Sequence, residues 1–138
     1  AYYLPNEDRI QLPPMSYFPA ATGYYSTLLH ELIHWSGHPT RCNRQLVSRF
    51  HADAYAMEEL VAEIGSAFLC SHCRIDGRLQ HAAYIDHWRR QLSRDSRLVI
   101  TAAQQAQRAA DFILGRVPRS AEESESHTAE EGREEEAA

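Results

Sequence analysis

The fold is decided by the stretch Leu28-Leu29-His30-Glu31-Leu32-Ile33-His34, which contains an H-E-x-x-H match. Apolar residues recur at helical spacing through this stretch, so we predict a helix that Thr22 caps. Gly37 and Pro39 end this helix near Ser36. Its predicted apolar positions are Tyr25, Leu28, Leu29, Leu32 and Ile33. Because residues four apart lie about one helical turn apart, both imidazoles project to one side and can bind one zinc ion.

Glu31 borders the same side of the helix, about 100° round from His30. From there its carboxylate can accept a proton from a water molecule on the zinc ion and pass it to the leaving amine of a peptide. The motif lies in mid-helix beside apolar residues, where unpaired polar groups cost free energy, which argues against a chance match. The motif therefore predicts a zinc site with peptidase-type chemistry, in which Glu31 is the catalytic base.

A catalytic zinc site needs a third protein ligand, and the sequence offers few candidates. The metzincin pattern is excluded, because its last histidine would fall at Thr40, although Gly37 fits. His38 lies four residues beyond His34. Gly37 and Pro39 break the helix there, however, and would turn the His38 side chain away. The better candidates lie on the next predicted helix.

That helix carries Glu58-Glu59-Leu60-Val61-Ala62-Glu63-Ile64-Gly65, which resembles the Asn-Glu-x-x-x-Asp pattern of gluzincins. In gluzincins the glutamate is the third ligand and the later acid supports a ligand histidine, so the resemblance implies these roles for Glu59 and Glu63. At spacing i and i+4 the two acids share a helix face, where like charges repel unless a cation or a histidine N–H accepts them. Glu59, Glu63 and His38 all remain candidates for the third ligand.

A short β-hairpin is predicted before the motif helix. Residues 2–4 and 9–12 are strand-like, and the turn-rich segment 5–8 separates them. The motif helix is followed by a loop rich in arginine, namely Arg41, Arg44 and Arg49.

Three more helices are predicted after this loop. The second helix of the chain has Asp53 as its N-cap and ends by residues 76–77. Its predicted apolar stripe is Met57, Leu60, Val61, Ile64 and Phe68. A third helix spans about residues 82–92, and an alanine-rich fourth spans about residues 97–114 before Gly115. The predicted fold class is therefore α+β and mostly helical, with a short N-terminal β-hairpin and about four helices.

The formal charge of −5 is distributed unevenly over the 138 residues. Residues 118–138 carry eight acids and two arginines, a net −6, with little to bury, which is typical of a disordered tail. Residues 1–117 carry 11 acids and 12 arginines, a net +1. We therefore predict one metallopeptidase-like domain at 1–117 and a disordered acidic tail at 118–138. The near-neutral domain makes direct DNA binding a weak alternative.

Three cysteines, an odd number, argue against a disulfide scaffold and indicate a reducing compartment. The stretch Cys70-Ser71-His72-Cys73 lacks the ligands for a zinc knuckle, and we expect Cys70 to pack as a small hydrophobe. No stretch approaches the roughly 18 to 20 apolar residues that span a membrane, and no signal peptide is apparent. A cytoplasmic protein without membrane association is expected.

The stretch Tyr24-Tyr25-Ser26-Thr27-Leu28-Leu29-His30-Glu31-Leu32-Ile33-His34-Trp35-Ser36-Gly37-His38 is one of several blocks that carry a family resemblance. The other blocks are residues 54–65, 67–70, 81–85 and 102–111. Together they resemble the C-terminal zincin-like metallopeptidase domain of ArdC-type plasmid antirestriction proteins, also found in TraC-type conjugative primases. The resemblance covers about residues 1–115. It implies a zincin-like fold with His30, His34 and Glu59 as zinc ligands.

In that family the peptidase-like domain usually follows an N-terminal domain that binds single-stranded DNA. The whole protein protects incoming conjugated DNA from restriction. This chain starts near the peptidase boundary, at Ala1. The resemblance therefore implies a fragment or a stand-alone relative, with DNA binding only through a domain missing before Ala1.

Two functions follow from these patterns. The first is a zinc metallopeptidase that hydrolyses peptide bonds of a peptide or protein substrate, with an extended peptide pairing on the hairpin's edge strand. The second is a non-catalytic, zinc-stabilised binding module that engages a restriction enzyme or another partner protein. The intact Glu31 favours the enzyme. The oligomeric state stays open, and the oxyanion donor stays open among Tyr84, His51, His81 and His87.

Overall fold

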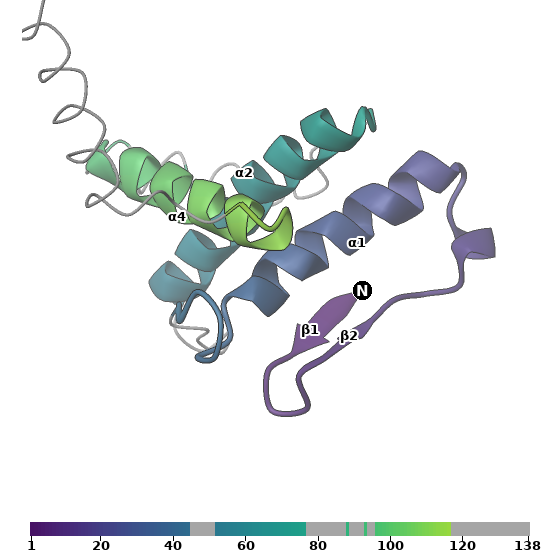
Figure 1. Cartoon of the computed structure of the whole chain (residues 1–138), viewed down its shortest axis with the longest axis horizontal. Coiled ribbons are helices and arrows are strands. Elements are labelled where there is room, and N and C mark those ends of the chain that lie inside the picture. Colours follow the sequence, from purple (N-terminus) through teal and green to yellow (C-terminus); the bar gives the residue numbers. More distant parts are fainter. Residues whose placement is uncertain (45–51, 77–87, 89–92, 94–95, 117–138) are drawn as a thin grey trace, which may run out of the picture.

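A computed structural model of the chain describes residues 1–44, 52–76, 88, 93 and 96–116. The elements are β1 (Tyr2–Leu4), β2 (Arg9–Gln11), a 3-10 helix η1 (Met15–Tyr17), α1 (Ala21–Ser36), α2 (Ala52–Cys73) and α4 (Arg97–Ile113). Figure 1 shows the hairpin on one side of α1 and the other two helices on its opposite side. The predicted class, α+β and mostly helical with a short hairpin, is confirmed. Within the described residues, none of the helices is both long and apolar enough to cross a membrane.

The predicted hairpin forms, with its second strand one residue shorter than expected. The strands are antiparallel, and Tyr3 lies opposite Ile10. In the turn, the Glu7 N–H donates to the Leu4 carbonyl, and Asp8 adopts a left-handed conformation at φ 47°. Aspartate tolerates this conformation better than most residues, so the turn chemistry read from the sequence explains the hairpin.

Arg41 anchors the hairpin to the end of α1. Its guanidinium pairs with the Asp8 carboxylate and lies 3.1 Å from the Tyr3 hydroxyl. Its Nε donates to the Trp35 carbonyl at 2.7 Å, and its guanidinium carbon lies 3.9 Å from the centre of the Trp35 ring. The Tyr3 hydroxyl also donates to Asp8, and burial with this contact raises the pKa of Tyr3 to about 12. These contacts fix the loop after α1 against the N-terminal segment.

Two expectations for α1 are wrong. The helix begins at Ala21 after Ala20, with no side-chain cap, so Thr22 lies inside the first turn. Tyr25 is 44% exposed and packs edge-on against Tyr24. The predicted stop is confirmed, because the helix ends at Ser36 and Gly37 closes it. The buried face of α1 is largely polar: its buried residues are Ser26, His30, Glu31, Ile33 and Ser36.

The inner face of α2 also differs from the predicted stripe. The helix begins at Ala52, so Asp53 is not its N-cap, and it ends at Cys73, before residues 76–77. Val61 is fully buried, whereas Phe68 is 38% exposed. The remaining predicted apolar residues, Met57, Leu60 and Ile64, pack at the edge of the core. Phe68 does not lie on the inner face of α2. Small residues line that face, because close contact between the helices leaves no room for a large ring.

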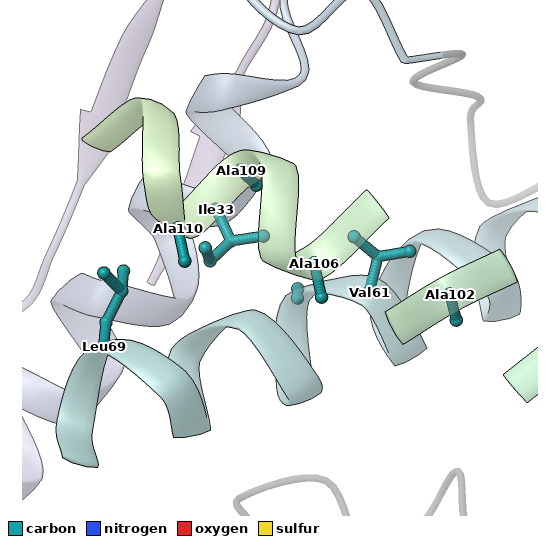
Figure 2. Packing of buried hydrophobic residues seen from close by; sticks show 8 residues of the cluster. Ile33, Val61, Leu69, Ala102, Ala106, Ala109 and Ala110 are labelled. Carbon is teal, nitrogen blue, oxygen red and sulfur yellow. The ribbon is translucent and has the colours of Figure 1, made fainter. Parts of the chain in front are cut away.

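The alanines of α4 allow this helix to lie directly on the inner face of α2. Its fully buried residues are Ala102, Ala106, Ala109 and Ala110, which pack with Ile33, Val61 and Leu69 (Figure 2). Gly115 ends the helix in a left-handed conformation at φ 66°, and the Arg116 N–H donates to the Asp111 carbonyl. This is the expected glycine stop. Cys70 is buried, as predicted, and burial raises the pKa of its thiol.

The predicted third helix at about 82–92 lies outside the described residues except for Trp88. Its indole N–H donates to the Ala56 carbonyl on α2 at 3.0 Å. The predicted tail at 118–138 also lies outside the described residues.

The approach of α1 to α2 is closest at Gly65. A Cβ added there would lie 2.7 Å from Cδ1 and 3.0 Å from Cγ1 of Ile33, which is fully buried. Because Ile33 cannot swing into solvent, an added methyl group must push the helices apart. Gly65 therefore fixes the spacing of the two helices that carry the site described below.

We expect Gly65→Ala to lower the free energy of unfolding by up to about 2 kcal/mol. Overpacking costs about 1–3 kcal/mol, and the better helix propensity of alanine offsets about 1 kcal/mol. Urea denaturation measures the difference. Gly23→Ala on α1 is the matched control, because its Cβ would lie 3.7 Å from Phe18 in ordinary contact. Equal stability of the two variants would contradict the close approach.

Candidate metal centre

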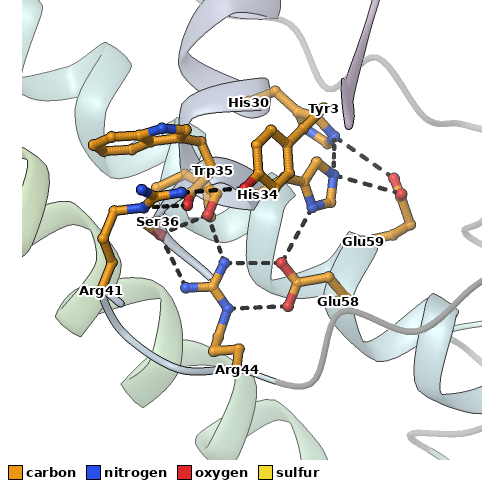
Figure 3. Close-up of polar contacts among 10 residues, drawn as sticks. Tyr3, His30, His34, Trp35, Ser36, Arg41, Arg44, Glu58 and Glu59 are labelled. Carbon is orange, nitrogen blue, oxygen red and sulfur yellow. Dashed lines mark hydrogen bonds and ion pairs between the residues drawn. The ribbon is translucent and has the colours of Figure 1, made fainter. Parts of the chain in front are cut away.

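Three predicted ligands meet between α1 and α2. His30 and His34 project from α1, and their Nε2 atoms lie 3.1 Å apart (Figure 3). The Glu59 carboxylate of α2 lies 3.6 Å from Nε2 of His30 and 3.5 Å from Nε2 of His34. At a tetrahedral ion with bonds of about 2.0–2.1 Å, ligand atoms lie about 3.3 Å apart. The three side chains therefore have the spacing of ligands around one metal ion.

The site is buried and rich in ionisable groups. His30, Glu31, Glu59 and Glu63 are each between 5% and 7% exposed. Carboxylates at this depth are unfavourable unless cations or hydrogen-bond donors surround them. The two imidazoles supply such partners, and a divalent ion bound between them would supply another. The donor set of nitrogen and carboxylate oxygen also suits zinc and other transition metals.

Glu63 lies behind His30. Its Oε1 is 3.8 Å from Nδ1 of His30, whereas Nε2 of the same ring faces His34 and Glu59. A carboxylate on the far nitrogen orients a ligand histidine instead of binding the metal itself. The position of Glu63 thus fits the supporting role implied by the gluzincin pattern.

The other candidates lie elsewhere. His38 follows the end of α1 and contacts Thr40, whose hydroxyl is 2.8 Å from Nδ1 of His38. Among the described residues it does not join the group that can hold a metal. The four oxyanion candidates, Tyr84, His51, His81 and His87, lie outside the described residues.

Two residues for which the sequence patterns predict no role, Glu58 and Arg44, form a connected group with His34. The Glu58 Oε1 lies 3.1 Å from Nδ1 of His34. Arg44 donates from Nη2 to Oε1 of Glu58 at 2.8 Å and from Nε to Oε2 at 3.0 Å. The signals were present in the sequence, as an acidic doublet at Glu58-Glu59 and an arginine-rich loop after the motif helix.

These contacts shift the ionisation of the buried groups. Burial opposes the charged form of Glu58, but hydrogen bonds with His34 and Arg44 outweigh it and lower the pKa of the carboxyl. Burial also opposes the charged form of His34, but Glu58 outweighs it and raises the pKa of the imidazole. The pKa of Glu59 falls to about 2 despite burial, chiefly through its hydrogen bond with His30. The Tyr55 hydroxyl also hydrogen-bonds Glu59, which is therefore a carboxylate at neutral pH.

Known proteins are similar to most of this chain. Residues 1–105 match the family model of zincin-like metallopeptidases. The chain is 44% identical over 115 residues to a DNA primase TraC of Escherichia coli, covering 83% of this chain and 11% of the primase. It is 43% identical over 115 residues to the uncharacterised protein y4eC of Sinorhizobium fredii, covering 82% of this chain and 38% of y4eC. The chain thus spans well under half the length of these relatives.

Two solved structures are also similar. Both are crystal structures of the antirestriction protein ArdC from plasmid R388. The metal-free structure is 46% identical with a TM-score of 0.72, and the Mn(II)-bound structure is 42% identical with a TM-score of 0.75. Each match covers 83% of this chain and 42% or 43% of the ArdC chain.

Proposed function

The chain belongs to the zincin-like metallopeptidase family, and we propose that it is a zinc-dependent peptidase domain of an antirestriction-type protein. The observation that carries this proposal is the buried triangle of His30, His34 and Glu59, whose spacing suits one metal ion. In this proposal the three side chains are the metal ligands and Glu63 supports His30. The Mn(II)-bound ArdC structure supports a divalent ion at such a site, and we assign zinc from the donor set.

In this proposal the ion, Glu31 and the hairpin have separate chemical roles. A bound divalent ion supplies Lewis acidity, which polarises the scissile carbonyl and acidifies a water molecule. Glu31 takes a proton from the attacking water and delivers it to the amine nitrogen as the peptide bond breaks. The hairpin offers a strand edge on which an extended peptide backbone can pair. The substrate class is therefore a peptide or an unfolded protein segment.

The proposal also covers the domain bounds, the location of the protein and its binding of DNA. We assign the peptidase domain to residues 1–117 and a disordered acidic tail to residues 118–138, supported by the charge distribution. The proposal includes a cytoplasmic role in plasmid conjugation, and the similarity to the antirestriction protein ArdC of plasmid R388 supports its plasmid context. The proposal assigns no DNA binding to residues 1–117, because they are nearly neutral.

A second function is favoured by the names of the relatives. They describe a primase and an antirestriction protein, and neither name states proteolysis. In this alternative the metal stabilises a surface that binds a restriction enzyme or another partner protein, without turnover.

Removal of the metal ion with a chelator distinguishes the peptidase from the binding module. The zinc-loaded chain is expected to cleave unfolded casein or a quenched fluorescent peptide library, to lose this activity with 1,10-phenanthroline, and to regain it when zinc is returned. In this proposal hydrolysis depends on the ion, because the ion supplies the Lewis acidity. Mass spectrometry of the products identifies the cleaved bonds. A chain that holds zinc stoichiometrically but cleaves none of these substrates would support the binding module instead.

A further inference from the structure

Both oxygens of the Glu58 carboxylate have hydrogen-bond partners. Its Oε1 contacts both Nδ1 of His34, at 3.1 Å, and Nη2 of Arg44, at 2.8 Å. Its Oε2 accepts from Nε of Arg44 at 3.0 Å. Figure 3 shows this two-pronged contact on the side of His34 that faces away from His30 and Glu59. Paired guanidinium and carboxylate groups of this geometry are strong and strongly directional.

Arg44 is itself held rigidly. Its side chain is 6% exposed, and its guanidinium donates to the Ser36 hydroxyl at 3.0 Å and to the Ile33 carbonyl. The loop that carries it folds back on α1, because the Arg44 N–H donates to the Gly37 carbonyl at 2.9 Å. Arg44 therefore satisfies carbonyl groups at the end of α1 and brings a fixed positive charge next to His34.

The two neighbouring glutamates consequently differ in what they can do. The carboxylate of Glu58 is paired with Arg44 and is therefore not available to bind the metal ion. It accepts a hydrogen bond from Nδ1 of His34 instead. A histidine that donates from Nδ1 keeps its Nε2 lone pair for a metal ion. Within the described residues, no arginine is paired with Glu59, whose carboxylate faces both Nε2 atoms.

We propose that Arg44 and Glu58 form a positioning pair that locks the His34 ring, with Nε2 turned to the metal, and keeps Glu58 away from the ion. This inference rests on the metal set proposed above. The pair does not touch substrate. Its effect appears in metal affinity, because a ligand that is already oriented loses less freedom when it binds.

The test compares two loop arginines in the full chain. Arg44→Ala removes the contact with Glu58, whereas Arg41→Ala removes an equally anchored guanidinium that contacts the hairpin and not His34. Glu58→Gln is the milder third variant, because it keeps the side-chain shape. Zinc affinity is measured by competition with a chromophoric chelator. We expect affinity about 10–100-fold weaker in Arg44→Ala and Glu58→Gln and close to wild type in Arg41→Ala.

Nitrogen-15 NMR of the zinc-loaded chain provides a readout that loss of stability alone does not move. We expect a downfield Nδ1–H signal for His34 in the wild type and in Arg41→Ala, and its shift or loss in Glu58→Gln. Wild-type affinity in Glu58→Gln, or equal weakening in both arginine variants, would overturn the positioning pair while leaving the metal site intact. A wild-type chain that binds no zinc would overturn the proposed function as well.

Discussion

Glu31→Gln is expected to lower the rate of peptide hydrolysis by about 10²–10⁴-fold, the usual contribution of a general base. The Glu31 side chain is 7% exposed, follows His30 directly on α1, and lies near enough to His34 for its charge to help raise the pKa of that imidazole. Glutamine has nearly the same shape and can still hydrogen-bond water, but it cannot accept a proton at neutral pH. The change therefore removes the proton transfer and leaves the fold and the ligands in place.

The measurement is kcat with a cleavable peptide, together with the zinc content of the same sample. Zinc content is expected to stay at the wild-type level, because the triangle of His30, His34 and Glu59 does not include Glu31. Glu31→Asp keeps the carboxylate but shortens the side chain, so its rate should lie between the other two. Loss of zinc together with activity in Glu31→Gln would contradict the role of proton acceptor.

Glu59→Ala is expected to leave the purified protein without stoichiometric zinc. The carboxylate of Glu59 lies within 3.6 Å of both Nε2 atoms, and without it the site has two protein ligands instead of three. Glu63→Ala is the matched comparison, because it removes a buried glutamate one turn along the same helix. Glu63 lies 3.8 Å from Nδ1 of His30, on the far side of the ring from Nε2, so its loss should weaken zinc binding by about 10–100-fold without emptying the site.

Elemental analysis after dialysis against zinc-free buffer distinguishes the three candidate ligands. His38→Ala should retain all its zinc, since His38 contacts Thr40 beyond the end of α1. Full zinc in Glu59→Ala with loss in Glu63→Ala would transfer the third ligand to Glu63. Full zinc in both variants would refute the gluzincin-like arrangement.

Local features of the chain could be predicted from the sequence. The hairpin follows from turn residues between two short strand-like runs, and α1 ends at Gly37 because glycine and proline interrupt a helix there. The H-E-x-x-H spacing alone brings His30 and His34 to one side. Each of these features depends on residues within a few positions of one another, so no partner element was needed to predict them.

The orientation of the helices could not be predicted in the same way. Phe68 fits an apolar stripe, yet the inner face of α2 is set by contact with α1 at Gly65 and with the alanines of α4. Glu58 was not assigned for a related reason. Its role depends on Arg44, which is 14 residues away and reaches it only because the loop folds back on α1. Contacts of this kind have no local pattern in the sequence.

Within the described part of the molecule, the hairpin anchored by Arg41 and the group of three helices are held by different kinds of contact. Neither strand contains a fully buried residue, and the hydrogen bonds that tie the hairpin to Arg41, in the loop after α1, join polar groups that water can replace. The three helices share an apolar core that water cannot enter without unfolding it. The hairpin can therefore open locally while the helices, and the histidines between them, stay folded. An extended peptide could thus exchange on and off its edge at no cost to the metal ligands.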